Sequence, residues 1–525
     1  MAEGAEIRSY SGSVRRWWWL SLTAFFLMGA AWAVALPANG TYDEKDHITR
    51  AYAVATGQLI PHHTIVNRRG DVVPGFLAPA SLLPSAATVD CTWSPRPPKP
   101  ASCQRWTDSR TRIVTQSAAA RYSPVYYLPA GLPLVLVPDL TGIVLARLVS
   151  VALSALLLAC AVGAALRLGG RLFPVAIMLS GTPLVMNLSG SVNPNGLEIA
   201  AGVLVFSSLL ALVRAPDGRL DDRAVRRLLV SACAGSVLLL TLRELGPVLL
   251  ALDVGACALL ARRGRLAALW RRRDARWALG ACWVAGLAFA AGWMEFSGFT
   301  DIAPNVRDAI HLPLSGELDQ IATYRIPFYL RQVVGEFSYG ETLVSSYMII
   351  GWYLLVAAIV VPCVRYAGRR HAAVLAALGV VCLALLVVLE LRFLPSIGWF
   401  SQGRYALPAL VGVMLGAAST DGFERRLAAR ARLRWYPAAL VAGATVLQVY
   451  ALCRVLTRFE SGIAAPLNPF PGTWHPSLGP VPPLLALLAG SALLAAVVTV
   501  APGRCPATEP PTAATDLGTV PATSV

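Results

Sequence analysis

The sequence predicts an all-α, polytopic membrane protein with about twelve transmembrane helices. Of its 525 residues, 56% are hydrophobic and only 14% are charged, whereas soluble domains carry roughly a quarter of charged residues. Hydrophobic runs recur along the chain, and many have the length of ~20 residues that a helix needs to cross a bilayer. Most of the basic residues behind the net charge of +16 lie in short segments between these runs. This distribution is typical of basic residues that orient a protein in a membrane, and not of a surface that binds nucleic acid. Membrane lipids are therefore expected partners, and nucleic acid is not.

The hydrophobic runs set the order of the elements. The predicted spans cover residues 17–36, 143–166, 172–190, 196–213, 228–242, 245–261, 277–294, 343–361, 372–390, 405–419, 435–453 and 481–500. With alternate connections in the cytoplasm, the arginine-rich segments 15–16, 167–171, 214–227, 262–276, 365–370 and 425–434 share one side. Because cytoplasmic connections are enriched in arginine, both termini are then cytoplasmic. The first run is long for a signal peptide, which favours an uncleaved span.

This topology divides the chain into three parts. Residues 1–16 form a cytoplasmic N-terminus, residues 17–500 a transmembrane domain, and residues 501–525 a disordered cytoplasmic tail, since its Pro/Thr/Ala-rich composition cannot bury a core. Three long polar segments, 37–122, 295–342 and 454–480, face outside, and loops of this length are usually functional or disordered. Of the ten cysteines, only Cys91 and Cys103 lie in these segments. An oxidising exterior makes a disulfide between them the expectation.

The first outer segment opens with a juxtamembrane helix, predicted over residues 42–56 and ended by Gly57. Asp43, His47 and Arg50 follow each other at helical spacing, which brings an acid, an imidazole and a guanidinium to one face. A structural alternative stays open, because Thr41 and Glu44 have the spacing of a capping box. A divalent metal on Asp43, Glu44 and His47 also stays open, because residues of one helical turn do not make a specific ligand set.

Further polar residues of the outer face are candidates for binding a phosphate or a sugar. They are Tyr126, Tyr127, Asn193, Arg243, Gln402, Arg404 and Tyr405. Arginine suits a phosphate because its planar guanidinium binds two oxygens at once. Each candidate has a structural alternative: an interfacial arginine can extend to lipid headgroups, a tyrosine can belong to the interfacial belt, and Asn-Pro can simply turn the chain.

Several of these residues lie in motifs that carry a resemblance. The Asp43-Glu44 pair after the first span, with His47 behind it, resembles the first loop of GT-C-type glycosyltransferases, which are polytopic enzymes using polyprenyl-phosphate sugars. Segments 122–129 (YSPVYYLP), 191–196 (SVNPNG) and 402–405 (QGRY) are similar, in order and position, to motifs of a bacterial membrane-protein family. That family is classed as a domain of unknown function, is common in actinobacteria and is related to GT-C enzymes.

The similarity extends from about residue 15 to 420, and it departs from the family at two positions. Asn195 stands where the family often has aspartate, and Ser123 replaces one proline of a Pro-Pro pair. The resemblance implies a GT-C-like fold, with Asp43 as the general base on an acceptor hydroxyl and Glu44 orienting acceptor or donor. His47, Arg50 and the polar residues of the other motifs are then expected to bind substrate.

The implied activity is transfer of a sugar from a polyprenyl-phosphate donor to a cell-envelope glycan or lipid, at the outer face of a bacterial plasma membrane. No cofactor is expected, apart from the metal left open above. The alternative is a transporter or flippase of a lipid-linked envelope precursor, because about twelve spans with both termini inside also suit a transporter. The concentration of polar residues in the outer segments favours chemistry at that face.

Overall fold

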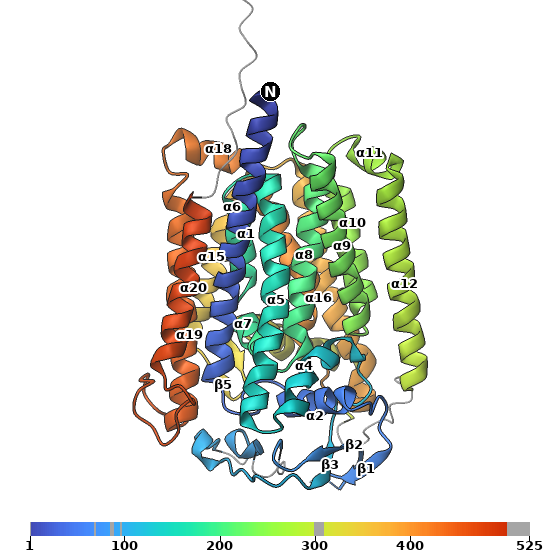
Figure 1. Cartoon of the computed structure of the whole chain (residues 1–525), viewed down its shortest axis with the longest axis vertical. Helices are drawn as coiled ribbons and strands as arrows, with labels where there is room; N and C mark the ends of the chain where they lie inside the picture. The colour runs from blue at the N-terminus through green and yellow to red at the C-terminus, as the bar shows by residue number, and fades with distance from the viewer. Residues whose placement is uncertain (1, 68–69, 84–88, 95–96, 299–308, 501–525) are drawn as a thin grey trace, which may run out of the picture.

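The computed structural model describes residues 2–67, 70–83, 89–94, 97–298 and 309–500. The expected tail, residues 501–525, lies outside the described residues. Within them the chain forms a bundle of long helices, with a layer of short helices and strands covering one end (Figure 1). The long helices are α1 (Ala2–Ala35), α5 (Leu140–Leu168), α8 (Pro194–Arg214), α9 (Asp222–Leu242), α12 (Arg273–Ser297), α15 (Ser346–Arg365), α16 (Arg369–Ile397), α19 (Trp435–Ser461) and α20 (Val481–Val500).

Shorter elements complete the two ends of the bundle. Within the bundle and at its arginine-rich end lie α6 (Leu172–Ser180), α7 (Pro183–Ser189), α10 (Gly246–Leu260), α11 (Arg265–Arg271), α17 (Leu407–Ala418) and α18 (Gly422–Ala429). The covered end carries α2 (Glu44–Ala55), β1 (His63–Val66), β2 (Val72–Pro79), η1 (Asp90–Thr92), η2 (Ala101–Cys103), β3 (Arg112–Gln116), α4 (Pro124–Leu136), α13 (Leu314–Gln320), the π-helical turn η4 (Ile321–Arg325), α14 (Ile326–Gly335), β4 (Glu336–Phe337), β5 (Thr342–Leu343) and η5 (Gly403–Tyr405).

Every predicted span corresponds to helical structure, although three of the twelve differ from a full span. In the described part of the chain, nine helices are long and apolar enough to cross a membrane, or ten if the bent pair α6–α7 is one span. That pair bends by 64°, since Thr182 caps α7 through a bond from the Val185 N–H and Pro183 begins the new helix. The predicted spans at 245–261 and 405–419 are the shorter apolar helices α10 and α17.

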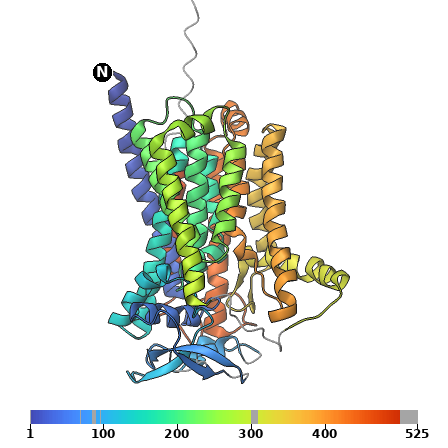
Figure 2. The ribbon, with the colours of Figure 1, turned by 90° about the vertical axis from the view of Figure 1, so that its right-hand side faces the viewer.

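Helix α8 is the centre of the bundle. Its apolar stretch is fully buried, as expected of a helix that is hydrophobic on every face. Helices α5, α9, α10 and α17 pack around it, while α1 packs against α5 and α20. Figures 1 and 2 show the long helices running nearly parallel around this centre.

The first outer segment contains a three-stranded antiparallel sheet that the all-α prediction did not include. Strand β2 pairs with β1 on one side, with Val66 opposite Val72, and with β3 on the other, with Gly75 opposite Gln116. Short runs of β-branched residues favour these strands. The side-chain amide of Gln58 bonds both the N–H and the C=O of Leu77, which attaches the sheet to the end of α2.

Helix α2 lies across the end of the bundle, between the sheet and the long helices (Figure 1). Its predicted boundaries are confirmed to within two residues. Helix α4 packs directly on it at Gly131, where a Cβ would collide with the carbonyl oxygen of Ala51. The glycine therefore permits the close approach of the two helices on which the first outer segment is built.

One buried arginine joins the three outer segments, and one disulfide closes a loop within the first of them. The predicted Cys91–Cys103 disulfide is present and closes a separation of 12 residues. Arg458, near the end of α19, donates to the carbonyl oxygens of Thr92 and Lys99 in the first segment. It also donates to the hydroxyl of Thr342 in the second segment, at 3.0 Å.

The double change Cys91→Ser, Cys103→Ser is expected to lower the thermal unfolding midpoint without preventing folding. Opening a loop of this length removes about 3 kcal/mol of chain-entropy stabilisation at most, while Arg458 still bonds two carbonyl oxygens within the loop, those of Thr92 and Lys99. Thermal melting of the purified protein measures the effect, and Cys453→Ser is the matched control. An unchanged midpoint, or alkylation of both cysteines in the wild type, would contradict the assigned bridge.

Candidate functional site

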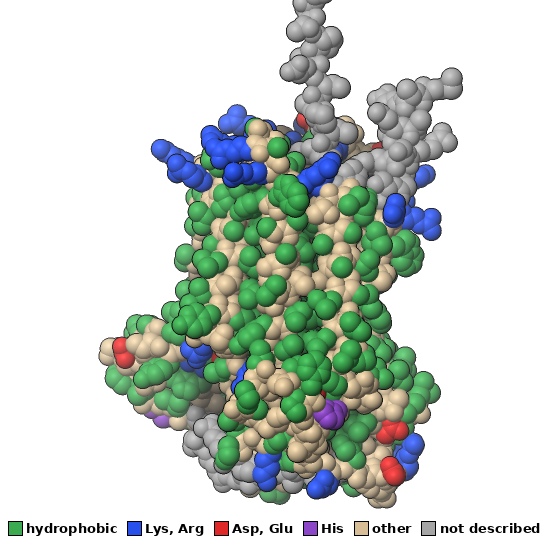
Figure 3. All heavy atoms as spheres, turned by 90° about the vertical axis from the view of Figure 1, so that its left-hand side faces the viewer, with side chains coloured by type: hydrophobic (Ala, Val, Ile, Leu, Met, Phe, Trp, Pro, Cys, Tyr) green, Lys and Arg blue, Asp and Glu red, His purple; other side chains and the backbone are tan. Residues whose placement is uncertain are grey.

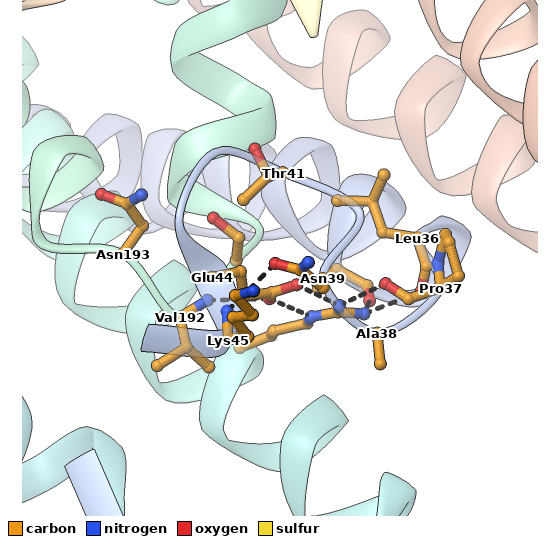
Figure 4. Close-up of polar contacts among 12 residues, drawn as sticks. Leu36, Pro37, Ala38, Asn39, Thr41, Glu44, Lys45, Val192 and Asn193 are labelled. Atoms are coloured by element: carbon orange, nitrogen blue, oxygen red, sulfur yellow. Dashed lines mark hydrogen bonds and ion pairs between the residues drawn. The ribbon is translucent and has the colours of Figure 1, made fainter. Parts of the chain in front are cut away.

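The site begins where α1 meets α2, around a buried ion pair that the sequence did not reveal. Glu44, the first residue of α2, is fully buried and accepts hydrogen bonds of 2.7 Å from both Nε and Nη2 of Arg147. Its Oε1 also accepts from the backbone N–H of Val192, in the connection before α8 (Figure 4). Glu44 thus fastens the start of α2 to two other segments of the chain.

Arg147 uses all five of its N–H groups. Besides Glu44, it donates to the carbonyl oxygens of Ala33, Leu36 and Pro37, at 3.2, 2.8 and 2.7 Å. These carbonyls belong to the last turn of α1 and the residues after it, which have no partner within the helix. The guanidinium is only 1% exposed. Its burial is tolerated because every N–H group has an acceptor and the carboxylate of Glu44 balances the positive charge.

Asp43 points elsewhere, although it is the neighbour of Glu44. Its backbone adopts the left-handed conformation with φ 57°, which turns its side chain away from that of Glu44. The carboxylate is 41% exposed and accepts from Nη2 of Arg404 at 3.3 Å through Oδ2. No capping box forms, since the hydroxyl of Thr41 donates to Asn187 and Asp43 makes no side-chain cap.

Arg404 lies in η5, directly before α17, and is held in place by aromatic rings and a close backbone contact. Its guanidinium carbon lies 4.4 Å from the ring centre of Tyr42 and 5.6 Å from that of Tyr405. A Cβ at Gly403 would lie 2.6 Å from the carbonyl oxygen of Tyr329, so only glycine fits before the arginine. Among the described residues, Nε and Nη1 of Arg404 are buried without a hydrogen-bond partner.

Arg243 approaches the same place from the connection between α9 and α10. Its guanidinium carbon lies 4.9 Å from the ring centre of Tyr405. This ring is therefore in contact with two arginines, Arg243 and Arg404, which come from different segments of the chain. Arg243 donates to Oδ1 of Asn195, and Nδ2 of Asn195 donates to Asn193 at 2.7 Å. Nδ2 of Asn193 in turn donates to the carbonyl oxygen of Tyr42, at 2.9 Å. This chain of bonds ends at the residue before Asp43.

Tyr42, Tyr122 and Glu336 belong to this site and were not among the sequence candidates. The Tyr42 hydroxyl donates to Glu336 at 3.2 Å, and burial is the main cause that raises the pKa of the Tyr42 hydroxyl and of the Glu336 carboxyl. Arg243 lies 5.3 Å from the ring centre of Tyr122. Burial raises the pKa of the Tyr122 hydroxyl, against the lowering effect of Arg243.

The structure encloses four of the expected substrate-binding residues in the protein interior. Nδ1 of His47 lies 2.8 Å from the hydroxyl of Tyr127, and burial followed by Arg243 lowers the pKa of His47 well below its usual value. The hydroxyl of Tyr126 lies 2.7 Å from that of Ser150. Arg50 is fully buried and donates to the carbonyl oxygens of Tyr122 and Leu59. These residues support the outer layer, because packing between α2, α4 and α5 covers them.

Gln402 lies at the edge of the site, where it bonds to a neighbouring outer segment. Its Oε1 accepts from Nε2 of Gln332 at 3.0 Å, and Gln332 belongs to α14. Of the sequence candidates, the structure therefore brings together Asp43, Asn193, Arg243, Gln402, Arg404 and Tyr405. Arg147 could have been found from the sequence, because it lies inside the predicted span 143–166, where ionisable residues usually pair with another group.

An apolar cavity of 470 Å³ begins beside Gly403 and follows α17 into the bundle. Its walls come from α14, α15, α16 and α17, and include Tyr329, Trp352, Leu386 and Met414. Nearly all of its lining is hydrophobic, which suits a hydrocarbon chain and not a soluble sugar. The cavity therefore leads from the membrane-spanning part of the bundle to the residue next to Arg404.

The three residues that the sequence suggested as metal ligands do not point toward one another. Asp43 faces Arg404, Glu44 binds Arg147 and His47 contacts Tyr127. Across the described part of the chain, no group of three or more His, Cys, Asp or Glu could hold a metal ion. These three side chains therefore do not form the metal-ligand set that the sequence left open.

Comparison with other proteins agrees with the family suggested by the motifs. Two solved structures of ArnT from Cupriavidus metallidurans are similar to the chain. The one bound to undecaprenyl phosphate has 15% identity and a TM-score of 0.41, over 90% of this chain and 76% of that chain. The apo form has 14% identity and a TM-score of 0.39, over 89% and 75%. No protein of curated function matches the sequence. A family model described as "Predicted membrane protein (DUF2142)" matches residues 26–413, and the chain belongs to this family.

Proposed function

We propose that the protein is a membrane glycosyltransferase that moves a sugar from a polyprenyl-phosphate donor to an acceptor hydroxyl at the outer membrane face. The observation that carries this proposal is the pairing of a half-exposed carboxylate, Asp43, with a buried arginine, Arg404, that has unused donors. The pair stands at the end of an apolar cavity. A base, an anion-binding group and space for a lipid chain thus meet in one place.

Asp43 is the proposed general base. Arg404 holds its Oδ2, and no described residue bonds its Oδ1, which leaves this oxygen for a substrate. In the reaction, the acceptor hydroxyl gives its proton to Oδ1 while its oxygen bonds to the anomeric carbon of the donor sugar. The bond from that carbon to the phosphate oxygen breaks, and the polyprenyl phosphate leaves with the electron pair. Glu44 positions Asp43 and does not touch substrate.

Arg404 and Arg243 are the proposed phosphate ligands. A buried donor without a partner costs about 1–3 kcal/mol, and Nε and Nη1 of Arg404 are two such donors. A phosphate placed there would remove this cost and gain a bidentate contact. Arg243 adds a second positive charge beside the ring of Tyr405. The apolar cavity that starts at Gly403 would then take the polyprenyl chain.

The acceptor is proposed to be a cell-envelope glycan or lipid. The sheet β1–β3 and the segment 314–325, which projects sideways from the bundle (yellow, at the right of Figure 2), border the outer end. Leu314, Leu318 and Tyr324 in this segment are exposed, so it suits the surface of a membrane. An acceptor held in the membrane would reach Asp43 from this side.

Transport of a lipid-linked precursor is favoured by one observation. Asp253 in α10 is fully buried, and neither of its side-chain oxygens has a hydrogen-bond partner among the described residues. Ionisable groups inside the membrane often mark transport pathways. Asp253 can therefore distinguish the two functions, since it lies in the short apolar helix α10 and outside the proposed reaction site.

Asp43→Asn is expected to lower sugar transfer by ~10²–10⁴-fold, the usual contribution of a positioned base. The fold should survive, because asparagine tolerates the left-handed backbone at this position. Membranes containing each variant would be assayed for a new glycosidic bond with radiolabelled polyprenyl-phosphate sugars. Asp253→Asn is the matched control and should transfer sugar normally.

Glu44→Gln should behave differently from Asp43→Asn. It leaves Arg147 buried without a counter-charge, a change that costs about 3–5 kcal/mol, so the main effect should be a lower unfolding midpoint. Normal transfer by Asp43→Asn would remove the proposed base. The transporter would be favoured if the wild type moved an intact lipid-linked glycan across the membrane and Asp253→Asn lost this transport.

Arg404→Gln is expected to raise the donor KM by about 10- to 100-fold, because a hydrogen bond to a charged group contributes about 1.5–3 kcal/mol. The acceptor KM should change little. Arg392→Gln removes the same charge from an exposed position of α16 and serves as the control. Equal effects of the two variants on the donor KM would contradict a specific phosphate contact at Arg404.

We further propose that both termini and the arginine-rich end face the cytoplasm. Helices α11 and α18, which lie in arginine-rich segments, are at the end opposite α2 and the sheet, and basic side chains gather at that end (Figures 1 and 3). Arginine is enriched in cytoplasmic connections of membrane proteins. The site would then lie outside.

A membrane-impermeant thiol reagent is therefore expected to label Val66→Cys in intact cells and Asp217→Cys only after lysis. Val66 in β1 is 64% exposed and Asp217 after α8 is 95% exposed, so both positions are accessible. Both variants would be made in a chain whose native free cysteines are replaced by serine. The reverse labelling pattern would place the site inside the cell and contradict the proposed donor.

A further inference from the structure

A second cavity, of 370 Å³, lies at the arginine-rich end of the bundle, opposite the proposed reaction site. It lies where α8, α10, α15, α16, α17 and α18 end or begin. Arg214, Arg262, Arg370 and Arg425 line it, and Asp421 is the only acidic residue in the lining. These four arginines come from four different connections or helix ends, so the concentration of charge is produced by the tertiary structure.

We infer that this cavity binds a phosphate group, such as that of an anionic phospholipid. Asp421 pairs with Arg425 at 3.7 Å and leaves an excess of positive charge. The enrichment of cytoplasmic connections in arginine explains basic residues at this end. It does not explain why four of them line one hollow, while others, such as Arg263 and Arg430, lie outside it. Arg214 and Arg262 are partly buried there, and Arg370 and Arg425 are exposed. Basic pockets between transmembrane helices recognise lipid headgroups in this way.

The start of α16 adds to the attraction for an anion. Gly368 precedes this 29-residue helix, and no side chain caps its first turn. The N–H groups of a helix start carry partial positive charge and bind phosphate readily. A Cβ at Gly368 would meet no atom within 4 Å, so the space beside this helix start is open. The arginines of the cavity and the start of α16 thus both present positive charge to a phosphate bound in the cavity.

The rim of the cavity suits a lipid. Leu259 and Tyr366 belong to the lining and are 55% and 37% exposed, respectively. A headgroup inside the cavity could therefore continue into acyl chains along an apolar edge at the level where the helices end. This binding is independent of the proposed reaction at the other end of the molecule.

The test compares binding of phosphatidylglycerol, phosphatidylcholine and inorganic phosphate to the full-length protein in detergent. Native mass spectrometry counts bound lipid, and thermal melting measures stabilisation by each probe. The wild type should bind phosphatidylglycerol more tightly than phosphatidylcholine. Arg370→Gln combined with Arg425→Gln should weaken phosphatidylglycerol binding roughly tenfold or more. The control, Arg263→Gln combined with Arg430→Gln, removes equal charge outside the cavity and should keep the preference.

A third variant, Gly368→Glu, places a carboxylate in the open space at the start of α16. Acidic residues stabilise a helix N-terminus, so the protein should fold while losing its response to phosphatidylglycerol. Stabilisation by inorganic phosphate without a lipid preference would support the site and assign it to a free anion. Equal losses in the cavity and control variants, or none in Gly368→Glu, would overturn the inference, because binding would then follow overall surface charge.

Discussion

The geometry of the outer face depends on one buried ion pair, between Arg147 in α5 and Glu44 at the start of α2. Removing a guanidinium from water is costly unless its charge and its N–H groups are matched. Arg147 satisfies this condition with Glu44 and the carbonyl oxygens at the end of α1. Since Glu44 also binds the N–H of Val192, three segments meet at fixed positions.

The same ion pair separates the functions of two adjacent acids. Helix α2 starts at Glu44, and the left-handed backbone of Asp43 directs its side chain toward the open face. The carboxylate of Glu44 thereby stabilises the fold, and that of Asp43 stays accessible. Asn193 reinforces this arrangement, because it bonds the carbonyl oxygen of Tyr42, the residue before Asp43. Asp43, the proposed base, is thus held mainly through the backbone beside it, which leaves its side chain accessible.

The two ends of the bundle use arginine in different ways. At the outer end, Arg147 and Arg404 are almost fully buried, and each lies against a carboxylate. In such surroundings of low polarity, a charge interacts strongly with any partner that reaches it. At the opposite end most arginines are exposed, although Arg214 and Arg262 are partly buried beside a cavity. The buried arginines suit the proposed reaction site, whereas the exposed ones suit the proposed orientation and the proposed lipid contact.

Sequence reasoning predicted much of the fold and named part of the candidate site. The spans could be predicted because hydrophobicity over about 20 residues is a local property. The small sheet was missed because its strands, such as His63–Val66, are short and lie within a polar segment. The motifs led to Asp43, Asn193 and Arg404, which the structure brings close together. They did not distinguish the residues that line the site from Tyr126 and Tyr127, which lie in its supporting core.

By itself, the sequence determined the family, the helices, the disulfide and the gathering of polar motifs at one end of the bundle. Only the tertiary structure decided which of two neighbouring acids is accessible. That decision rests on Arg147, which lies 103 positions from Glu44 in the chain. Burial, and the partner that makes burial of a charge tolerable, depend on segments that meet only in the folded chain. Spacing along one helix carries no information about such a partner.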